Sequence, residues 1–390
     1  MQTFNMGRVP PITFGAGRLR KAPGLVAEFG GGPTLIVADA ILASLGTTDA
    51  LTESLSAQGI PHMLAADIAG EPKIALVDAL CKKAREIEAT SVIALGGGAA
   101  MDAAKVVAAI APSGKPAVDF DLAAQPLPGG GLPAIAIPTT AGTGSEVTRT
   151  AVISRADGSK SWFWGEELMF AQAILDPELT VSLPPHLTAW TGIDAVAHAL
   201  EGATARTTSP AGSLCGLDAL RTLAEFLPRA VADGTDMEAR GQVLWASMVA
   251  GLSLHNCNTH MGHNISHALG SLAPIHHGLA TGLALEVTLP ELVSRPEGRE
   301  NYARAAAAMG ASGYATSLPD RFAELMRACK IDRALPDCCA SVSVASLAEH
   351  MKTDYNFGMS QNAACNIDHN DLDTFAEAML DLPMLEEKAA

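Results

Sequence analysis

Short apolar runs alternate with longer amphipathic segments through the first half of the chain. Apolar runs occur at 34–38, 62–66 and 91–95, and each is followed by Asp or Gly. Between them, residues 45–58 and 74–88 have the spacing of helices. Strands that alternate with helices in this way are typical of a mostly parallel sheet with helices on both faces. We therefore predict an α/β domain, and such sheets bind ligands at the carboxyl ends of their strands.

Two strand ends have the composition of anion-binding loops. The run at 91–95 leads into Gly96, Gly97 and Gly98, after which residues 99–110 read as a helix. Glycines let backbone approach a pyrophosphate, and a helix N-terminus offers free N–H groups. The pattern is not GxGxxG, and a tight turn explains a bare GGG equally well. The next strand, 133–138, leads into hydroxyl donors that suit a second anion-binding loop. These are Thr139, Thr140, Thr143 and Ser145.

Asp39 ends the strand at 34–38, where the ribose of a dinucleotide could lie. A carboxylate there accepts hydrogen bonds from ribose hydroxyls and repels a 2′-phosphate, which favours NAD over NADP. The alternative is that Asp39 is the N-cap of the following helix.

Histidines are concentrated in the second half of the chain, and six of the eleven lie between Leu254 and Gly278. If their segments are helical, Asp194 and His198 share one helix face, as do His263 and His267, because residues at i and i+4 are neighbours. Imidazoles and a carboxylate that converge in this way suit Fe²⁺ or Zn²⁺, and the sequence has no CxxC pair for a thiolate site.

Further on, 301–309 and 318–330 have helical spacing of Ala and Leu and read as core-facing helices.

Composition narrows the class of protein. The formal charge of −16 and the lack of Lys/Arg runs argue against nucleic acid or an anionic membrane as a partner. Seven cysteines, an odd count with little paired spacing, fit a reducing compartment. The first residues lack the apolar core of a signal peptide, and no run approaches the ~18 apolar residues that span a bilayer. We predict a soluble cytoplasmic protein.

Four motifs, in chain order, resemble the iron-containing (group III) alcohol dehydrogenases. They are GGGAAMDAAK, PTTAGTGSEVT, ILDPELTVSLPPHLTAWTGIDAVAHALEG and HNISHALGSLAPIHHG, and the likeness extends over nearly the whole chain. The resemblance implies a dehydroquinate synthase-like fold, in which an α/β NAD(P)-binding domain at 1–179 precedes an all-helical metal-binding and catalytic domain at 180–390. It also implies an NAD-dependent alcohol dehydrogenase, or aldehyde or ketone reductase, that forms a homodimer or a higher homo-oligomer.

Carried over by motif, the metal ligands are Asp194, His198, His263 and His277. His267 matches the histidine that the family is thought to use to move the proton. The positions that match the family's dinucleotide site are Asp39, Gly97, Gly98, Asp102, Thr139, Thr140, Thr143, Lys160, Leu179 and Leu183.

Departures from the family pattern leave the substrate open. His276 stands where relatives commonly have proline, Glu71 precedes Pro72 in place of Asn, and the aromatic cluster at 162–164 has no evident role. Counted back from His263 by helical steps, Asn256, Thr259 and His260 fall near the metal-presenting face, which predicts a small polar carbonyl or alcohol substrate. Arg149 and Thr150 could add a cation and a donor.

Two other classes of protein fit the sequence less well. A dehydroquinate synthase-like lyase would share the fold, NAD and a metal, but the ligand region lacks the Lys and Arg cluster that its phosphorylated substrate requires. A non-catalytic sensor would keep the fold without turnover, and nothing in the sequence favours it.

Overall fold

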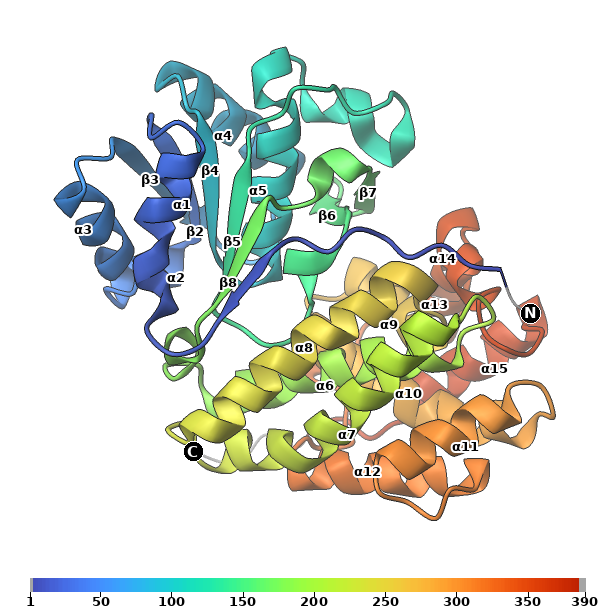
Figure 1. Ribbon diagram of the computed structural model, residues 1–390. Coiled ribbons are helices and arrows are strands. Elements are labelled where there is room, and N and C mark those ends of the chain that lie inside the picture. The colour runs from blue at the N-terminus through green and yellow to red at the C-terminus, as the bar shows by residue number, and fades with distance from the viewer. Residues whose placement is uncertain (1–2, 386–390) are drawn as a thin grey trace. The chain divides into compact units, whose positions relative to one another are not determined.

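A six-stranded parallel sheet forms the centre of the first part of the chain (Figure 1). The computed structural model describes residues 3–385. The sheet order is β1-β8-β5-β4-β2-β3, and all its pairings are parallel. The strands are β1 (Ile12–Phe14), β2 (Thr34–Asp39), β3 (His62–Ile68), β4 (Ser91–Gly96), β5 (Ala134–Pro138) and β8 (Gln172–Leu175).

Helices cover both faces of this sheet, as the strand–helix alternation predicted (Figure 1). They are α1 (Ala22–Glu28), α2 (Ala40–Ser44), α3 (Asp49–Ala57), α4 (Ile74–Glu86) and α5 (Gly98–Ile110). Successive strand side chains point to opposite faces, so Leu35 and Val37 join a core with α4 and α5, whereas Ile36 and Ala38 join one with α1 and α3. Burial on both faces explains why the strands are continuous apolar runs.

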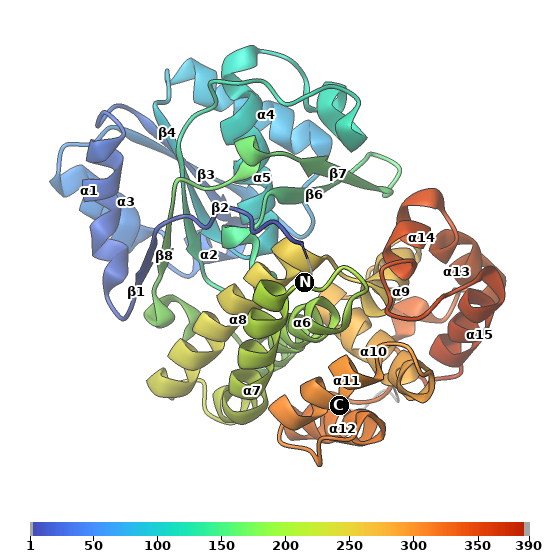
Figure 2. The same ribbon diagram turned by 45° about the vertical axis from the view of Figure 1, so that its right-hand side comes forward.

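An antiparallel hairpin of β6 (Thr150–Ser154) and β7 (Lys160–Trp164) follows β5 (Figure 2). It accounts for the aromatic cluster that the sequence left unexplained. Phe163 is fully buried in the α4–α5 side of the core and Trp162 is nearly so, while Trp164 is partly exposed. The role of the aromatic cluster at 162–164 is therefore structural, because two of its side chains pack in the core beneath the hairpin.

A buried lysine and a buried glutamate lie beside this hairpin. The ammonium of Lys105 donates to Thr148 Oγ1 at 2.9 Å and to Thr150 O at 2.8 Å. Burial lowers the pKa of Lys105 to about 8 and raises the pKa of Glu146 to about 7, from an ordinary value of 4.5. Because the folded protein holds Glu146 protonated more readily than the unfolded chain does, its ionisation costs stability as the pH rises from 4.5 to 7.

We therefore expect Glu146→Gln to raise the melting temperature at pH 8, where it relieves on the order of 3 kcal/mol at ~1.4 kcal/mol per pKa unit. The gain should vanish near pH 4.5, and thermal unfolding across this range checks it. Glu166→Gln, at an exposed glutamate, is the control and should change stability by less than ~0.5 kcal/mol. If Glu146→Gln proved less stable than the wild type at pH 8, the ionised carboxylate would be stabilising.

The rest of the chain is helical (Figure 1). Its helices are α6 (Pro185–Thr204), α7 (Pro210–Ala232), α8 (Met237–Cys257), α9 (Met261–Leu272), α10 (His277–Ser294), α11 (Arg299–Ala308), α12 (Leu318–Ala328), α13 (Val344–Met351), α14 (Asp354–Ser360) and α15 (His369–Leu380). The helices α6, α7 and α8 pack on one another, and α10 packs on α6 and α9. None of the helices within 3–385 has both the length and the apolar character needed to cross a membrane.

The chain divides into two units. One comprises Arg8–Leu183, and the other comprises the chain from Pro184 onward together with the segment that precedes Arg8. That short segment is bound to the helical unit, where Gly7 N donates to Asn256 Oδ1 at 2.9 Å. The ranges 1–179 for an NAD(P)-binding domain and 180–390 for a metal-binding and catalytic domain stay a prediction.

Candidate metal centre and dinucleotide-binding loops

Helix α6 carries a stripe of buried polar residues on one face. It starts at a proline, which suits the first helical turn, and its interior is almost entirely buried. Asp194, His198 and Glu201 lie at i, i+4 and i+7, so their side chains leave the helix on the same side. The i, i+4 spacing predicted for the first two is confirmed.

Two further helices bring their first turns to this stripe. His263 lies in the first turn of α9, and His277 is the first residue of α10. Residues 273–276 connect the two helices. Each histidine lies in the first turn of its own helix. Gly278 lets α10 approach α6 closely, since a Cβ there would lie 2.1 Å from Trp190 O.

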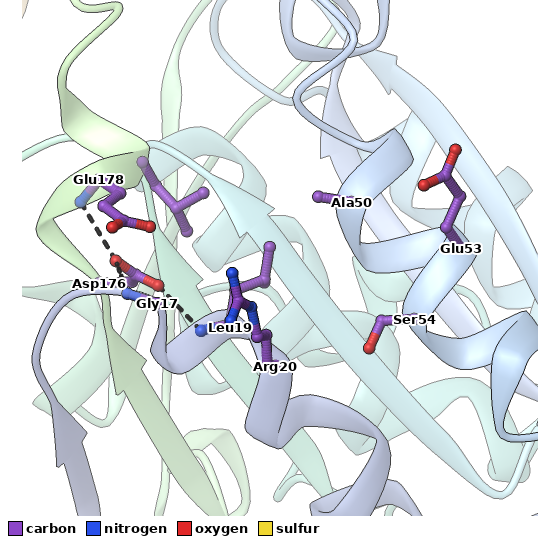
Figure 3. Close-up of a pocket in the computed structure, with 9 residues that line it drawn as sticks. Gly17, Leu19, Arg20, Ala50, Glu53, Ser54, Asp176 and Glu178 are labelled. Atoms are coloured by element: carbon purple, nitrogen blue, oxygen red, sulfur yellow. Dashed lines mark hydrogen bonds between the residues drawn. The ribbon is translucent and has the colours of Figure 1, made fainter.

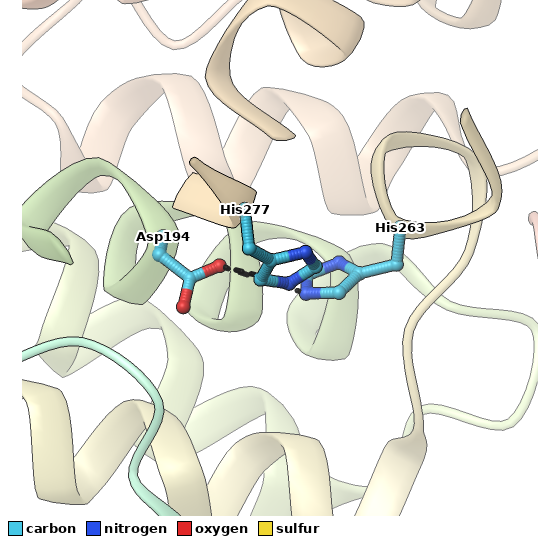
Figure 4. Close-up of side chains that lie close together, drawn as sticks. All are labelled: Asp194, His263 and His277. Carbon is cyan, nitrogen blue, oxygen red and sulfur yellow. Dashed lines mark ion pairs between the residues drawn. The ribbon is translucent and has the colours of Figure 1, made fainter. Parts of the chain in front are cut away.

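Asp194, His263 and His277 point toward one another (Figure 4). Asp194 Oδ1 lies 3.8 Å from His263 Nε2 and 3.6 Å from His277 Nε2. Among the described residues, Asp194 Oδ1 and His263 Nε2 are buried without a hydrogen-bond partner. Buried polar atoms are normally paired. Unpaired donor atoms of nitrogen and oxygen that converge in this way fit a divalent cation such as Fe²⁺ or Zn²⁺.

The other two predicted histidines flank this cluster. The His198 ring stacks on that of His263 with centroids 4.6 Å apart, and its Nδ1 lies 4.0 Å from Asp194 Oδ2. The His267 ring lies 5.0 Å from that of His277. All five residues that the sequence singled out for the metal and for proton transfer are therefore brought together.

The electrostatics of the cluster favour an ionised Asp194 and a neutral His277. For His263, burial by itself lowers the pKa, but the carboxylates of Glu201 and Asp194 outweigh it and raise that pKa above its ordinary value. Burial by itself raises the pKa of Asp194, but the nearby histidines outweigh it and hold that pKa below its usual range. Burial lowers the pKa of His277 well below its ordinary value. A neutral imidazole has a free lone pair, which a metal ligand needs.

His276, the neighbouring imidazole, is directed elsewhere. Its ring packs against Trp190 with centroids 5.1 Å apart, and Trp190 in turn meets His186 edge-on at 5.0 Å. The three-residue donor cluster contains His277 and not His276. The residue that replaces the family's proline thus belongs to an aromatic group beside the cluster.

In the α/β unit, Asp39 meets the glycine loop that follows β4. Its Oδ2 accepts a hydrogen bond from Gly97 N at 2.8 Å, and a Cβ on Gly96 would lie 2.3 Å from the same oxygen. Gly96 has φ 154°, a conformation that favours glycine. Asp39 does stand at the N-cap position of α2, but its side chain makes no capping hydrogen bond. Asp39 thus occupies the N-cap position, as the alternative predicted, while its carboxylate binds the glycine loop and not the first turn of α2.

The two predicted anion-binding loops touch each other at the start of α5. Gly97 is the N-cap and Gly98 the first residue of that helix, and a Cβ on Gly98 would lie 2.6 Å from Thr143 Cγ2. Thr140 Oγ1 would lie 3.4 Å from a Cβ on Gly97, and Thr139 N donates to Gly96 O at 2.9 Å. Side chains in place of these glycines would fill the space at the helix N-terminus, and this open cradle fits a pyrophosphate.

Two residues that were predicted to bind the dinucleotide, Asp102 and Lys160, form hydrogen bonds or an ion pair with other residues of the α/β unit. Asp102 accepts from Ser145 Oγ at 2.6 Å and from Val152 N at 2.8 Å, so it ties the second loop to the hairpin. Lys160 forms an ion pair with Glu71, which gives a structural reason for the Glu that precedes Pro72.

A pocket of about 520 Å³ opens beside the C-terminal end of β8 (Figure 3). Leu179 lines it, together with Arg20 and Glu53. Asp176 holds its wall by accepting from Gly17 N, Leu19 N and Glu178 N, the contacts drawn in Figure 3. Of the predicted dinucleotide residues, Leu179 alone lines this pocket.

The substrate-facing role predicted for Asn256, Thr259 and His260 is wrong. His260 is fully buried and its Nε2 lies 3.0 Å from Thr204 Oγ1, Thr259 Oγ1 contacts Met359 Sδ, and Asn256 binds Gly7. Helical counting failed because α8 ends at Cys257 and α9 begins at Met261. Asn258 has φ 58°, which breaks the helix between them.

Arg149, proposed together with Thr150 as a further substrate contact, forms an ion pair with Glu166 at 2.9 Å, and both side chains of this pair are exposed. Sequence reasoning also missed Glu201, whose three residues of spacing from His198 were the available signal. Burial by itself raises the pKa of Glu201, but His260 and His263 bring it down to about 2.

Comparison with known families decides the relationship. The family described as iron-containing alcohol dehydrogenase matches residues 10–177, and the C-terminal part of the Fe-containing alcohol dehydrogenase family matches residues 188–377. The chain belongs to the iron-containing alcohol dehydrogenases. The predicted family, fold class and reaction class, an oxidoreductase acting on CH–OH groups, are thereby confirmed.

Relatives of this iron-containing alcohol dehydrogenase differ in substrate. It is 37% identical over 282 residues to choline dehydrogenase of Bacillus subtilis (strain 168), covering 71% of this chain and 70% of that protein. It is 36% identical over 301 residues to the probable alcohol dehydrogenase EutG of Escherichia coli (strain K12), covering 74% of each. A crystal structure of sulfoacetaldehyde reductase from Bifidobacterium kashiwanohense in complex with NAD+ matches with TM-score 0.90 and 27% identity, over 98% of this chain and all of that one.

Proposed function

We propose that this protein uses NAD(H) and a divalent metal to interconvert a small polar alcohol and its aldehyde or ketone. The observation that carries this proposal is the convergence of Asp194, His263 and His277. Asp194 Oδ1 and His263 Nε2 are buried there without a hydrogen-bond partner among the described residues. Asp194, His198, His263 and His277 would hold the ion. When bound, Fe²⁺ or Zn²⁺ supplies a Lewis acid for the substrate oxygen.

The chain's own residues supply orientation and proton movement. Asp194 keeps its negative charge in a buried site, where it would balance the charge of a bound cation. His267, whose ring lies 5.0 Å from that of His277, would pass a proton to or from the alcohol oxygen. An imidazole has an ordinary pKa of ~6.5 and both donates and accepts near neutral pH. NAD⁺ is the hydride acceptor in the oxidative direction.

NAD should be preferred to NADP, because Asp39 sets a carboxylate beside the glycine loop. We expect Asp39→Gly to relax the preference. Asp39→Asn is the matched variant, since it keeps an oxygen to accept from Gly97 N but removes the charge, and it should relax the preference as well. Steady-state kinetics with NADH and NADPH checks both variants. Faster turnover of wild type with NADPH at equal concentration would contradict this role of Asp39.

The polar character of the substrate rests on relatives, now that Asn256, Thr259 and His260 no longer support it. The names of two relatives specify choline and sulfoacetaldehyde, both small molecules with a charged group. One is a cation and the other an anion, so they support polarity without fixing the sign of charge.

The test is NADH consumption by the metal-loaded enzyme across matched pairs of carbonyl compounds. Succinic semialdehyde against butanal is one such pair, and we expect kcat/KM to favour the polar member. A tenfold or greater preference for unsubstituted aldehydes across several pairs would overturn the proposed substrate class. Turnover without net NADH oxidation would instead favour a lyase.

We also propose a cytoplasmic location and a homodimer or higher homo-oligomer. All seven cysteines are free, as a reducing compartment favours. Light scattering of the purified protein tests the oligomeric state.

A further inference from the structure

Glu201 lies directly behind the predicted ligand His263. Both the carboxylate and the imidazole are buried, and His263 Nδ1 lies 2.6 Å from Glu201 Oε2. Glu201 belongs to the same face of α6 as Asp194 and His198. This face of α6 therefore contributes to the donor cluster in two ways. Asp194 belongs to the cluster itself, and Glu201 contacts the ring of His263, which also belongs to it.

The carboxylate is held by backbone donors from the start of α9. His260 N donates to Oε2 at 3.0 Å and Gly262 N donates to Oε1 at 2.6 Å. These donors, together with His263 Nδ1, point at an acceptor with two oxygens. An ionised carboxylate has no hydrogen to donate, so the hydrogen of the His263 contact resides on Nδ1.

The buried His260 side chain also lies beside the carboxylate, without a hydrogen bond from its Nδ1 to any of the described residues. His260 Nδ1 lies 3.3 Å from Glu201 Oε1, and its Nε2 lies 3.0 Å from Thr204 Oγ1. Thr204 Oγ1 in turn donates to Leu200 O at 2.8 Å. All of these groups are buried. The position of Glu201 is therefore fixed by three hydrogen bonds, from His260 N, Gly262 N and His263 Nδ1, in a buried site.

We infer that Glu201 is a positioning residue for His263, holding the imidazole as its Nδ1–H tautomer so that the lone pair of Nε2 faces Asp194 and the cation. His263 Nε2, buried without a hydrogen-bond partner among the described residues and 3.8 Å from Asp194 Oδ1, is the atom so presented. A carboxylate behind a ligating histidine fixes its ring and strengthens it as a ligand. This inference rests on the proposed metal site.

A purely structural role makes a different prediction. Glu201 also satisfies two N–H groups at the start of α9, and the loss of such a cap costs ~1 kcal/mol. If that were its whole role, its replacement would lower stability and leave metal affinity unchanged. The contact with His263 Nδ1 distinguishes the two roles.

The experiment is titration of the metal-free full chain with Co²⁺, by competition with a chelator and by the visible Co²⁺ spectrum, well below the melting temperature. Glu201→Gln offers one acceptor oxygen to these donors, and its amide group can force His263 to carry its hydrogen on Nε2. We expect Co²⁺ affinity to fall about 10- to 100-fold, with a changed spectrum. Glu286→Gln is the matched control, a carboxylate-to-amide change on α10, the helix of His277, where Glu286 pairs with Arg333. It should leave Co²⁺ affinity unchanged.

Unchanged affinity and spectrum in Glu201→Gln, while Asp194→Ala abolishes binding, would overturn the positioning role and leave the metal site standing. If the wild type binds no Co²⁺, or if its Co²⁺ binding survives Asp194→Ala, both the proposed metal site and the positioning role of Glu201 would be overturned. If Glu201→Gln does not fold, Glu201→Asp takes its place. It keeps the charge but withdraws it by about one carbon–carbon bond, ~1.5 Å. We expect several-fold weaker Co²⁺ binding in that variant, and an unchanged affinity would equally overturn the inference.

Discussion

Replacing Asp194 by Ala should remove the bound metal and lower kcat/KM on the order of 10³-fold or more, the effect of losing several kcal/mol of charge stabilisation. Asp194 supplies the carboxylate of the donor cluster, and its Oδ1 lies within 3.8 Å of nitrogen atoms on both His263 and His277. Without it, the cation would lose the one carboxylate among its predicted ligands. Elemental analysis of the purified variant, together with NADH kinetics, measures both effects.

His276→Ala is the matched control for this site, because it removes an imidazole adjacent to His277 that packs on Trp190. It should retain about one metal ion per chain, whereas His277→Ala should lose the ion as Asp194→Ala does. Metal retained in His277→Ala and lost in His276→Ala would mean that the neighbouring imidazole is the ligand.

Gly278→Ala should destabilise the helical unit by about 3 kcal/mol or more and lower its metal affinity. The added Cβ would lie 2.1 Å from Trp190 O and 3.1 Å from Asp194 Cβ. The first of these is a backbone atom, so relief requires that α10 move away from α6. That movement would carry His277 away from Asp194. Thermal unfolding and Co²⁺ titration measure the two consequences.

Gly270→Ala provides the comparison within the same unit. Gly270 lies in α9, and a Cβ there would meet nothing within 4 Å. Alanine should be neutral or stabilise the helix by up to ~1 kcal/mol. If Gly278→Ala were as stable as Gly270→Ala and bound metal as tightly, the close approach of α10 to α6 would not be required for the site.

The parts of the site that follow from local spacing could be read from the sequence. Asp194 and His198 lie one turn apart on one helix, and the glycine loop directly follows a strand, so neither depends on the rest of the fold. The sheet was predictable for the same reason, since the continuous apolar runs are short-range features.

What escaped the sequence depends on contacts between distant segments or on a single backbone angle. The donors to Glu201 lie about 60 residues further along the chain, and no local pattern marks such a pairing. His260 was misplaced because one residue, Asn258, leaves the helical conformation. Helical counting puts His260 one turn before His263 on the same face, but only if the helix is continuous. Because the helix breaks at Asn258, the His260 side chain is buried instead.

The N-terminal segment has a consequence for how the protein responds to proteolysis. The chain enters the α/β unit after Gly7 and leaves it at Leu183, so this unit is inserted within the sequence of the helical one. A single cut between Leu183 and Pro184 would therefore leave the residues that precede Arg8 covalently attached to the α/β fragment yet bonded to Asn256 of the helical fragment. Gly7 would then provide a non-covalent contact between the two fragments, whereas a cut on each side of the inserted unit would leave no covalent link to the helical unit at either end.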